Sequence, residues 1–111
     1  MLPFWFPLVL HVQIIDEGRQ DASHKIMVFC QTARMAEFLG ALFVAAGVPG
    51  TMQIHSKMTQ SKRTQVSNKF RKAQGGVVLF TSDVSARGVD YPNTSLIVQV
   101  RVRLTLQRSV L

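Results

Sequence analysis

The chain has 111 residues and a formal net charge of +7, and 47% of its residues are hydrophobic, which fits one domain with a modest core. Its single cysteine, Cys30, excludes an intramolecular disulfide and gives no support for secretion, so we expect an intracellular protein. The cysteine and the three histidines lack metal-ligand spacing, so the sequence indicates no metal site.

Residues 1–15 form the most apolar segment. They fall short of the roughly 18 residues that a membrane-spanning helix needs, and Pro3 and Pro7 interrupt them. No basic region precedes them as in a signal peptide. We therefore expect no membrane contact and, within a helical lead-in of residues 1–24, a helix from about residue 7 to residue 21. An apolar surface is left exposed there if a neighbouring domain is missing.

The acidic pair Asp16-Glu17 follows two isoleucines and imitates the end of a Walker B strand, where a magnesium site would lie. The chain contains no Gly-x-x-x-x-Gly-Lys-Ser/Thr loop to accompany such a site. Gly18 directly after the pair ends a helix equally well, so we assign these acids to a helix end.

The rest of the chain alternates short apolar runs with longer amphipathic segments. Thr59 is a suitable N-cap for one helix, and Gly47 closes the other. Alternation of this kind predicts an α/β fold with a parallel sheet and helical crossovers. The expected strands are 25–30, 51–55, 77–81 and 95–100, and the expected helices are 33–46 and 60–73. The residues predicted as the core face of helix 33–46 are Met35, Phe38, Leu39, Leu42 and Phe43.

Residues 77–80 are fully apolar, as in a strand buried on both faces of a sheet. The segment 81–90 that follows lies where ligands collect in open α/β sheets, beyond the carboxyl end of a strand. There Arg87 offers a planar charged fork for phosphate, and Gly88 offers an accessible N–H. The alternative is a capped turn with a surface arginine.

Basic residues gather between residues 55 and 90, where only Asp83 and Asp90 oppose them. Such a surface suits a polyanion, although a solvated helix face has the same composition. Helical spacing puts Arg63 on one face with Val66 and Phe70, so this arginine borders the packed side of its helix. Its methylene stem alone would also account for that position. The basic residues are Lys57, Lys62, Arg63, Lys69, Arg71, Lys72 and Arg87.

Several motifs together resemble one family. The run at 85–90, Ser-Ala-Arg-Gly-Val-Asp, resembles motif V of the DEAD-box RNA helicases, and residues 25–32 resemble the strand that opens their second helicase domain. The run at 60–63, Gln-Ser-Lys-Arg, resembles the family's Gln-x-x-Arg element. Order and spacing agree over residues 25–100, roughly two thirds of the chain. The resemblance implies a three-layer RecA-like sheet flanked by helices, truncated. Residues 101–111 begin with alternating basic and apolar residues and do not resemble the family, so we expect a divergent tail there.

The resemblance also implies the roles of individual residues. It places Thr81, Arg87, Gly88 and Arg63 near an RNA backbone. It places Gly88 and Asp90 at an ATP site, whose magnesium ligands are not in this chain. Gln60 and Asp83 would support the loop at residues 81–90. The partners implied are RNA and an N-terminal RecA-like domain, in the same or a separate chain.

The departures from the family pattern concern catalysis. No phosphate-binding loop is present, and the His-Arg-x-Gly-Arg-x-Gly-Arg segment is absent. We therefore expect no catalytic residue in this chain and no activity from it alone, although the intact family member is an ATP-hydrolysing RNA helicase. The alternatives are a non-enzymatic RNA-binding or partner-binding module and a truncated product without independent activity.

Overall fold

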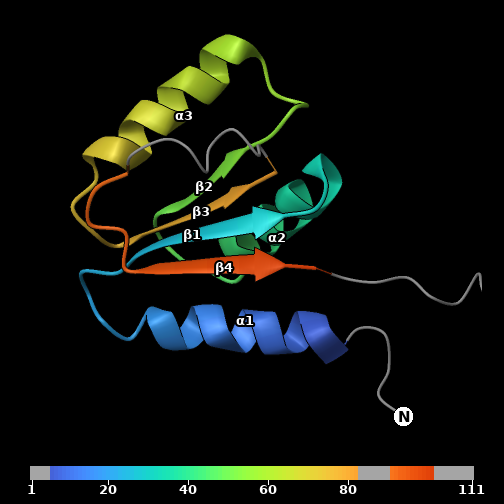
Figure 1. Cartoon of the computed structure of the whole chain (residues 1–111), viewed down its shortest axis with the longest axis vertical. Coiled ribbons are helices and arrows are strands. Elements are labelled where there is room, and N and C mark those ends of the chain that lie inside the picture. The colour runs from blue at the N-terminus through green and yellow to red at the C-terminus, as the bar shows by residue number, and fades with distance from the viewer. Residues whose placement is uncertain (1–5, 83–90, 102–111) are drawn as a thin grey trace, which may run out of the picture.

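The computed structural model describes residues 6–82 and 91–101, and its elements follow the predicted order (Figure 1). Each strand and helix expected between residues 25 and 100 is found within a few residues of its predicted ends. The elements are α1 (Phe6–Gly18), β1 (Lys25–Cys30), α2 (Ala33–Ala45), β2 (Thr51–Ile54), α3 (Gln60–Lys72), β3 (Val77–Thr81) and β4 (Leu96–Val100).

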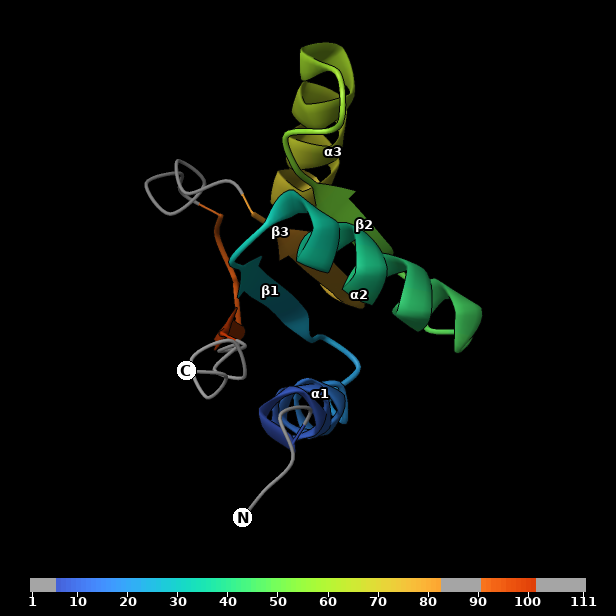
Figure 2. The same ribbon diagram turned by 90° about the vertical axis from the view of Figure 1, so that its right-hand side faces the viewer.

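The four strands form one parallel sheet in the order β2-β3-β1-β4. Helices α1 and α2 contribute to the core on one face of this sheet, and α3 contributes to the core on the other. Figure 2 shows α2 and α3 separated by the strands, with α1 running beside the β4 end of the sheet. The predicted α/β fold with three layers is therefore confirmed.

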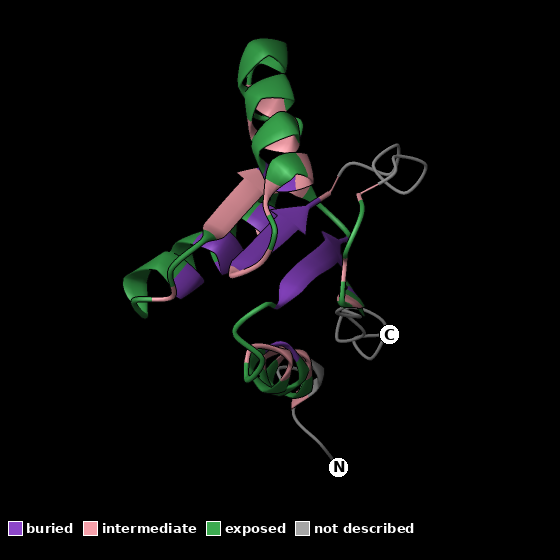
Figure 3. Cartoon of the chain, turned by 90° about the vertical axis from the view of Figure 1, so that its left-hand side faces the viewer, coloured by how far each residue is buried: buried purple, intermediate pink, exposed green. Residues whose placement is uncertain are grey.

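Side chains of the central strands alternate between the two cores. In β1, Ile26, Val28 and Cys30 pack with α1 and α2, while Met27 and Phe29 pack with α3. All residues of β1 and β3 are buried, as the purple ribbons in Figure 3 show. A strand with helices on both faces has no solvated side, which explains its continuous apolar sequence.

The helix ends follow local chemistry. The hydroxyl of Thr59 accepts a hydrogen bond from the backbone N–H of Lys62 at 3.2 Å, so the predicted cap is confirmed. Thr32 caps α2 in the same way through the N–H of Met35, at 3.1 Å. After α2, Gly47 has a φ of +81°, the left-handed conformation typical of a helix C-terminus.

The predicted core of α2 is partly wrong. Leu39 and Phe43 are buried, but Phe38 is 52% exposed and Leu42 is 43% exposed. The buried face also contains Ala36 and Gly40, and a Cβ at Gly40 would collide with the side chain of Gln53 in β2, so these small residues let the helix approach the sheet. The prediction weighted large apolar residues and so set the buried face too far toward Phe38 and Leu42.

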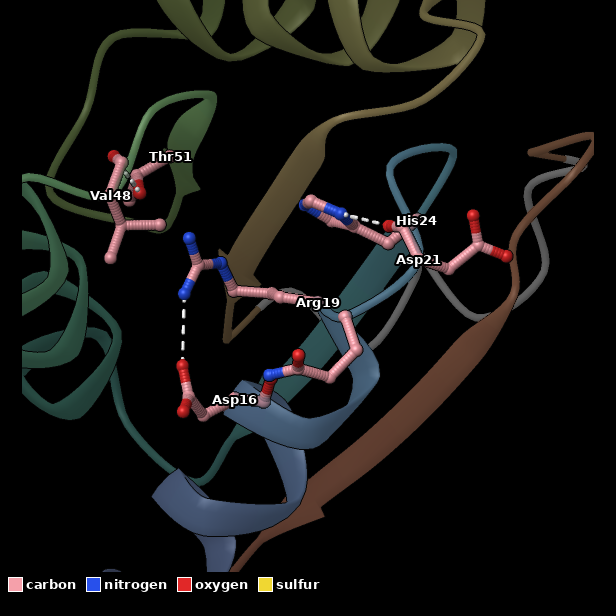
Figure 4. A network of polar contacts seen from close by, with 7 residues as sticks. Asp16, Arg19, Asp21, His24, Val48 and Thr51 are labelled. Carbon is pink, nitrogen blue, oxygen red and sulfur yellow. Dashed lines mark hydrogen bonds and ion pairs between the residues drawn. The ribbon is translucent and has the colours of Figure 1, made fainter.

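The end of α1 confirms that Asp16 belongs to a helix and not to a Walker B strand (Figure 4). Its carboxylate forms an ion pair with Arg19 at 2.9 Å. After the helix ends at Gly18, the chain turns through Asp21, whose backbone carbonyl lies 2.8 Å from Nδ1 of His24. Ile15 is fully buried in the core, which anchors this helix to the sheet.

The opposite side of α1 is more open. Val9, Leu10 and Ile14 are each at least 40% exposed, so this helix presents apolar surface to solvent. Within the described ranges, no helix is both long enough and apolar enough to cross a membrane.

Candidate nucleic-acid interface

Three strands end around one hollow at the carboxyl edge of the sheet. Its volume is about 310 Å³, and residues from β1, β4 and the end of β3 line it. This is the edge at which open α/β sheets bind ligands. The predicted site segment begins here, since Ser82 lies in the wall of the hollow. The lining residues are Phe29, Cys30, Gln31, Ser82, Gln99, Val100 and Arg101.

Most of the predicted site residues in this segment, namely Asp83, Arg87, Gly88 and Asp90, lie outside the described residues. Thr81 is described as the last residue of β3, in register with Phe29 of β1 and Ile54 of β2. It is fully buried, so its predicted contact with RNA stays a prediction.

Arg63 and Gln60 lie together in the first turn of α3. The guanidinium Nη2 of Arg63 donates a hydrogen bond to the side-chain oxygen of Gln60 at 2.9 Å. The Nε of Arg63 is buried and has no hydrogen-bond partner among the described residues. A guanidinium has five N–H donors in a planar fork, so the bond to Gln60 leaves other donors of Arg63 for an anionic acceptor such as phosphate. The predicted packing is confirmed, because Arg63 is half-buried on the same face as the buried Phe70.

The rest of α3 carries positive charge without opposing acids. The helix contains no Asp or Glu, and its last turn contains Lys69, Arg71 and Lys72. Lys69 and Lys72 are exposed, while Arg71 lies over the ring of Tyr91 at 5.5 Å. The basic surface expected from the sequence is therefore present on this helix, where it produces a field that attracts polyanions.

His55 supports the beginning of the loop that leads to α3. It is 3% exposed, and its Nδ1 accepts a hydrogen bond from the backbone N–H of Lys57 at 3.3 Å. Since Nδ1 is an acceptor, the ring is neutral and Nε2 donates to the side chain of Gln53 at 3.0 Å. Burial is the main cause that lowers the pKa of His55 below 6.5. The charge of Glu37 raises this pKa, whereas the charges of Lys57 and Arg63 lower it. This histidine is therefore both packed and hydrogen-bonded directly after β2.

We expect this histidine to make stability depend on pH. Because its pKa is lower in the folded chain, the unfolded chain takes up a proton first as the pH falls through 6.5. The free energy of unfolding should therefore be highest above pH 6.5 and fall toward pH 5. Urea denaturation at pH 7.5 and pH 5.5 measures this, with His55→Gln as the variant expected to lose the difference. The same difference in the variant would assign the effect to other groups.

The structure gives no evidence for a catalytic thiol or a metal centre in the part of the chain that it describes. Burial raises the pKa of Cys30 to about 12, so this thiol stays protonated and unreactive at neutral pH. Among residues 6–82 and 91–101, no group of three His, Cys, Asp or Glu side chains is placed to hold a metal ion.

Sequence reasoning missed the role of Lys25 at the start of β1. Its side chain is fully buried, and its ammonium donates to the carbonyls of Arg71, Ala73 and Pro92 at 3.2, 3.0 and 2.8 Å. It thereby ties the end of α3 to the chain that leads into β4. A lysine at a strand start has no sequence signal that distinguishes this role from surface exposure.

Comparison with known proteins identifies the family. A model of the helicase conserved C-terminal domain matches residues 8–110. DEAD-box ATP-dependent RNA helicase 25 of Oryza sativa subsp. japonica is 38% identical over 94% of this chain and 18% of its own length. DEAD-box ATP-dependent RNA helicase 31 of Arabidopsis thaliana is 46% identical over 83% of this chain and 13% of its own length. The chain thus spans less than a fifth of these curated relatives.

Two solved structures of Mss116p have the same fold. One is Mss116p bound to ssRNA and AMP-PNP, with a TM-score of 0.75, 29% identity, and coverage of 89% of this chain and 20% of that one. The other is DEAD-box helicase domain 2 of Mss116p bound to an RNA duplex, with a TM-score of 0.71 and 28% identity. The match covers 96% of this chain and 43% of that one. The family match over residues 8–110 and these likenesses show that the chain belongs to the helicase conserved C-terminal domain family, in its DEAD-box branch with the RecA-like fold.

Proposed function

We propose that this domain binds the phosphate backbone of RNA without reading its sequence. The observation that carries the proposal is Arg63, which Gln60 holds in place while its buried Nε has no partner among the described residues. The absence of acids from α3 adds a favourable field around it. The solved Mss116p structures of this fold, bound to ssRNA and to an RNA duplex, support the same choice of ligand.

Other residues would complete the RNA contact and one side of an ATP site. We assign Thr81, Arg87 and Gly88 to RNA with Arg63, and Gly88 with Asp90 to ATP. Gln60 and Asp83 would position the loop that carries these groups. The domain is taken as residues 25–100, preceded by the lead-in at 1–24 and followed by the tail at 101–111.

ATP hydrolysis and unwinding would need a second RecA-like domain. Transfer of the terminal phosphoryl group requires phosphates and magnesium to be held by a phosphate-binding loop, and this chain contains none. The present domain would bring RNA and the ribose side of ATP to the closed assembly. By itself it would bind RNA and leave ATP unhydrolysed.

The Arg63→Ala variant tests the RNA contact. We expect it to bind a fluorescein-labelled single-stranded RNA about fivefold to tenfold more weakly than the original chain in low salt, because one phosphate contact is lost. Fluorescence anisotropy measures both affinities. Lys72→Ala is the matched control, since it removes the same charge at the other end of α3. Equal losses in the two variants would reduce Arg63 to a general electrostatic role.

A further inference from the structure

Among the described residues, no strand pairs with the outer edge of β2. This strand is the last strand in the order β2-β3-β1-β4, at the margin of the sheet in Figure 1. The carbonyls of Gly50 and Ile54 accept hydrogen bonds from β3 and its extension, at 2.9 and 3.3 Å. Residues alternate in a strand, so the backbone groups of Thr51 and Gln53 point to the outer edge.

A groove runs along this edge. Its volume is about 570 Å³, larger than the hollow at the carboxyl ends of the other strands. Residues of β2 line it together with residues from α2, from α3 and from the loop between β2 and α3. The lining residues are Glu37, Thr51, Met52, Gln53, His55, Lys57, Met58, Lys62, Val66 and Lys69.

The groove combines positive charge with apolar surface. Lys62 and Lys69 are exposed and have no ion-pair partner among the described residues, whereas Lys57 pairs with Glu37 at 3.0 Å. The two lysines lie seven residues apart in α3, so they project from the same side of the helix. Between them is Val66, and apolar surface continues to the methionines that line the groove.

We propose that this groove binds an extended acidic polypeptide segment, which adds to β2 as a fifth strand of the sheet. The backbone of such a segment pairs with Thr51 and Gln53 along the open edge. Its acidic side chains meet Lys62 and Lys69, and its apolar side chains contact Val66 and the methionines. A row of backbone donors and acceptors is complementary to another polypeptide, which favours this partner over a nucleic acid.

The probe is a labelled peptide of two Glu-Ser-Val-Ser repeats, blocked at both ends, which places glutamate and valine on the same face of an extended strand. It is titrated with the 111-residue chain. We expect binding that weakens about tenfold or more in Lys62→Glu/Lys69→Glu, because attraction becomes repulsion at two positions. Lys72→Glu, a charge reversal outside the groove lining, should leave affinity within about twofold of the original chain. Thermal unfolding of each variant checks that the fold is retained.

A second peptide with the same side chains, N-methylated at every residue, tests strand addition separately from charge. It cannot donate backbone hydrogen bonds, so it should fail to bind, while the parent peptide should slow amide hydrogen exchange at Thr51 and Gln53. Equal binding of both peptides, or indifference of the parent peptide to the Lys62/Lys69 reversal, overturns the proposal. Displacement of the peptide by single-stranded RNA, with the same two amides protected by RNA, would assign the groove to nucleic acid instead.

Discussion

Gly50→Ala is expected to lower the free energy of unfolding by about 3 kcal/mol or more, because two penalties act at the same position. Gly50 has a φ of +74°, a conformation that residues with a Cβ rarely adopt. A Cβ built there would also collide with the backbone carbonyl oxygen of Gly76. That atom belongs to the tight entry into β3 and cannot move away like the end of a side chain. Urea denaturation followed by circular dichroism measures the loss.

Gly47→Ala is the matched control for this prediction. Gly47 also has a positive φ, +81°, but a Cβ there would have no atom within 4 Å. Only the conformational penalty then remains, which we expect to be about 1 kcal/mol. The difference between the two variants therefore isolates the collision with Gly76. Equal losses in the two variants would show that the backbone segments at Gly50 and Gly76 can move apart without cost in free energy.

Lys25→Met is expected to lower the free energy of unfolding by about 2–4 kcal/mol, since it removes the buried ammonium group that donates to three backbone carbonyls. Methionine has a similar volume but no hydrogen-bond donor, so Arg71, Ala73 and Pro92 would each lose the ammonium group. Two of these carbonyls belong to the end of α3, where a positive charge is favourable. The same denaturation measurement gives the loss.

Burial works against this lysine as well. Loss of solvation, with a smaller contribution from the charge of Arg71, lowers the pKa of Lys25 in the folded chain. The prediction is that three hydrogen bonds outweigh that penalty. Lys72→Met, at an exposed position of the same helix, should change stability by less than about 0.5 kcal/mol. A Lys25→Met chain as stable as the original would mean that the buried charge costs as much as its hydrogen bonds contribute.

The elements were predictable because their signals are local. Thr59 caps α3 through its own hydroxyl, and Gly47 ends α2 through its own backbone conformation. The continuous apolar run of β3 has a simple cause too, since helices cover both faces of that strand. The two helix ends depend on a few neighbouring residues, and the apolar run is itself the sequence signal of a strand covered on both faces, so the sequence displays all three directly.

Features that depend on distant residues were predicted less well. The buried face of α2 is set by contact with the sheet, and small residues such as Gly40 define it as much as the large ones. Lys25 meets carbonyls that lie 46 to 67 residues away in sequence, so no local pattern marks it. The tight approach of Gly50 to Gly76 is likewise visible only once β2 and β3 are paired.

The candidate site was found through motifs more than through periodicity. Helical spacing did place Arg63 on the packed side of α3, and the structure adds its hydrogen bond to Gln60. Arg87, Gly88 and Asp90 were selected by resemblance and lie outside the described residues, so their roles stay predictions. The groove along β2 had no motif at all, because residues from α2, β2 and α3 form it.

The most direct measurement is the RNA affinity of the purified 111-residue chain, by fluorescence anisotropy, for two labelled single strands of unrelated sequence across a salt titration. Contact with the phosphate backbone predicts similar affinities for both strands and a steep loss as salt rises, by about 0.7 in the logarithmic slope for each phosphate contacted. A preference for one sequence that survives high salt, or no binding by a folded chain, would contradict the account.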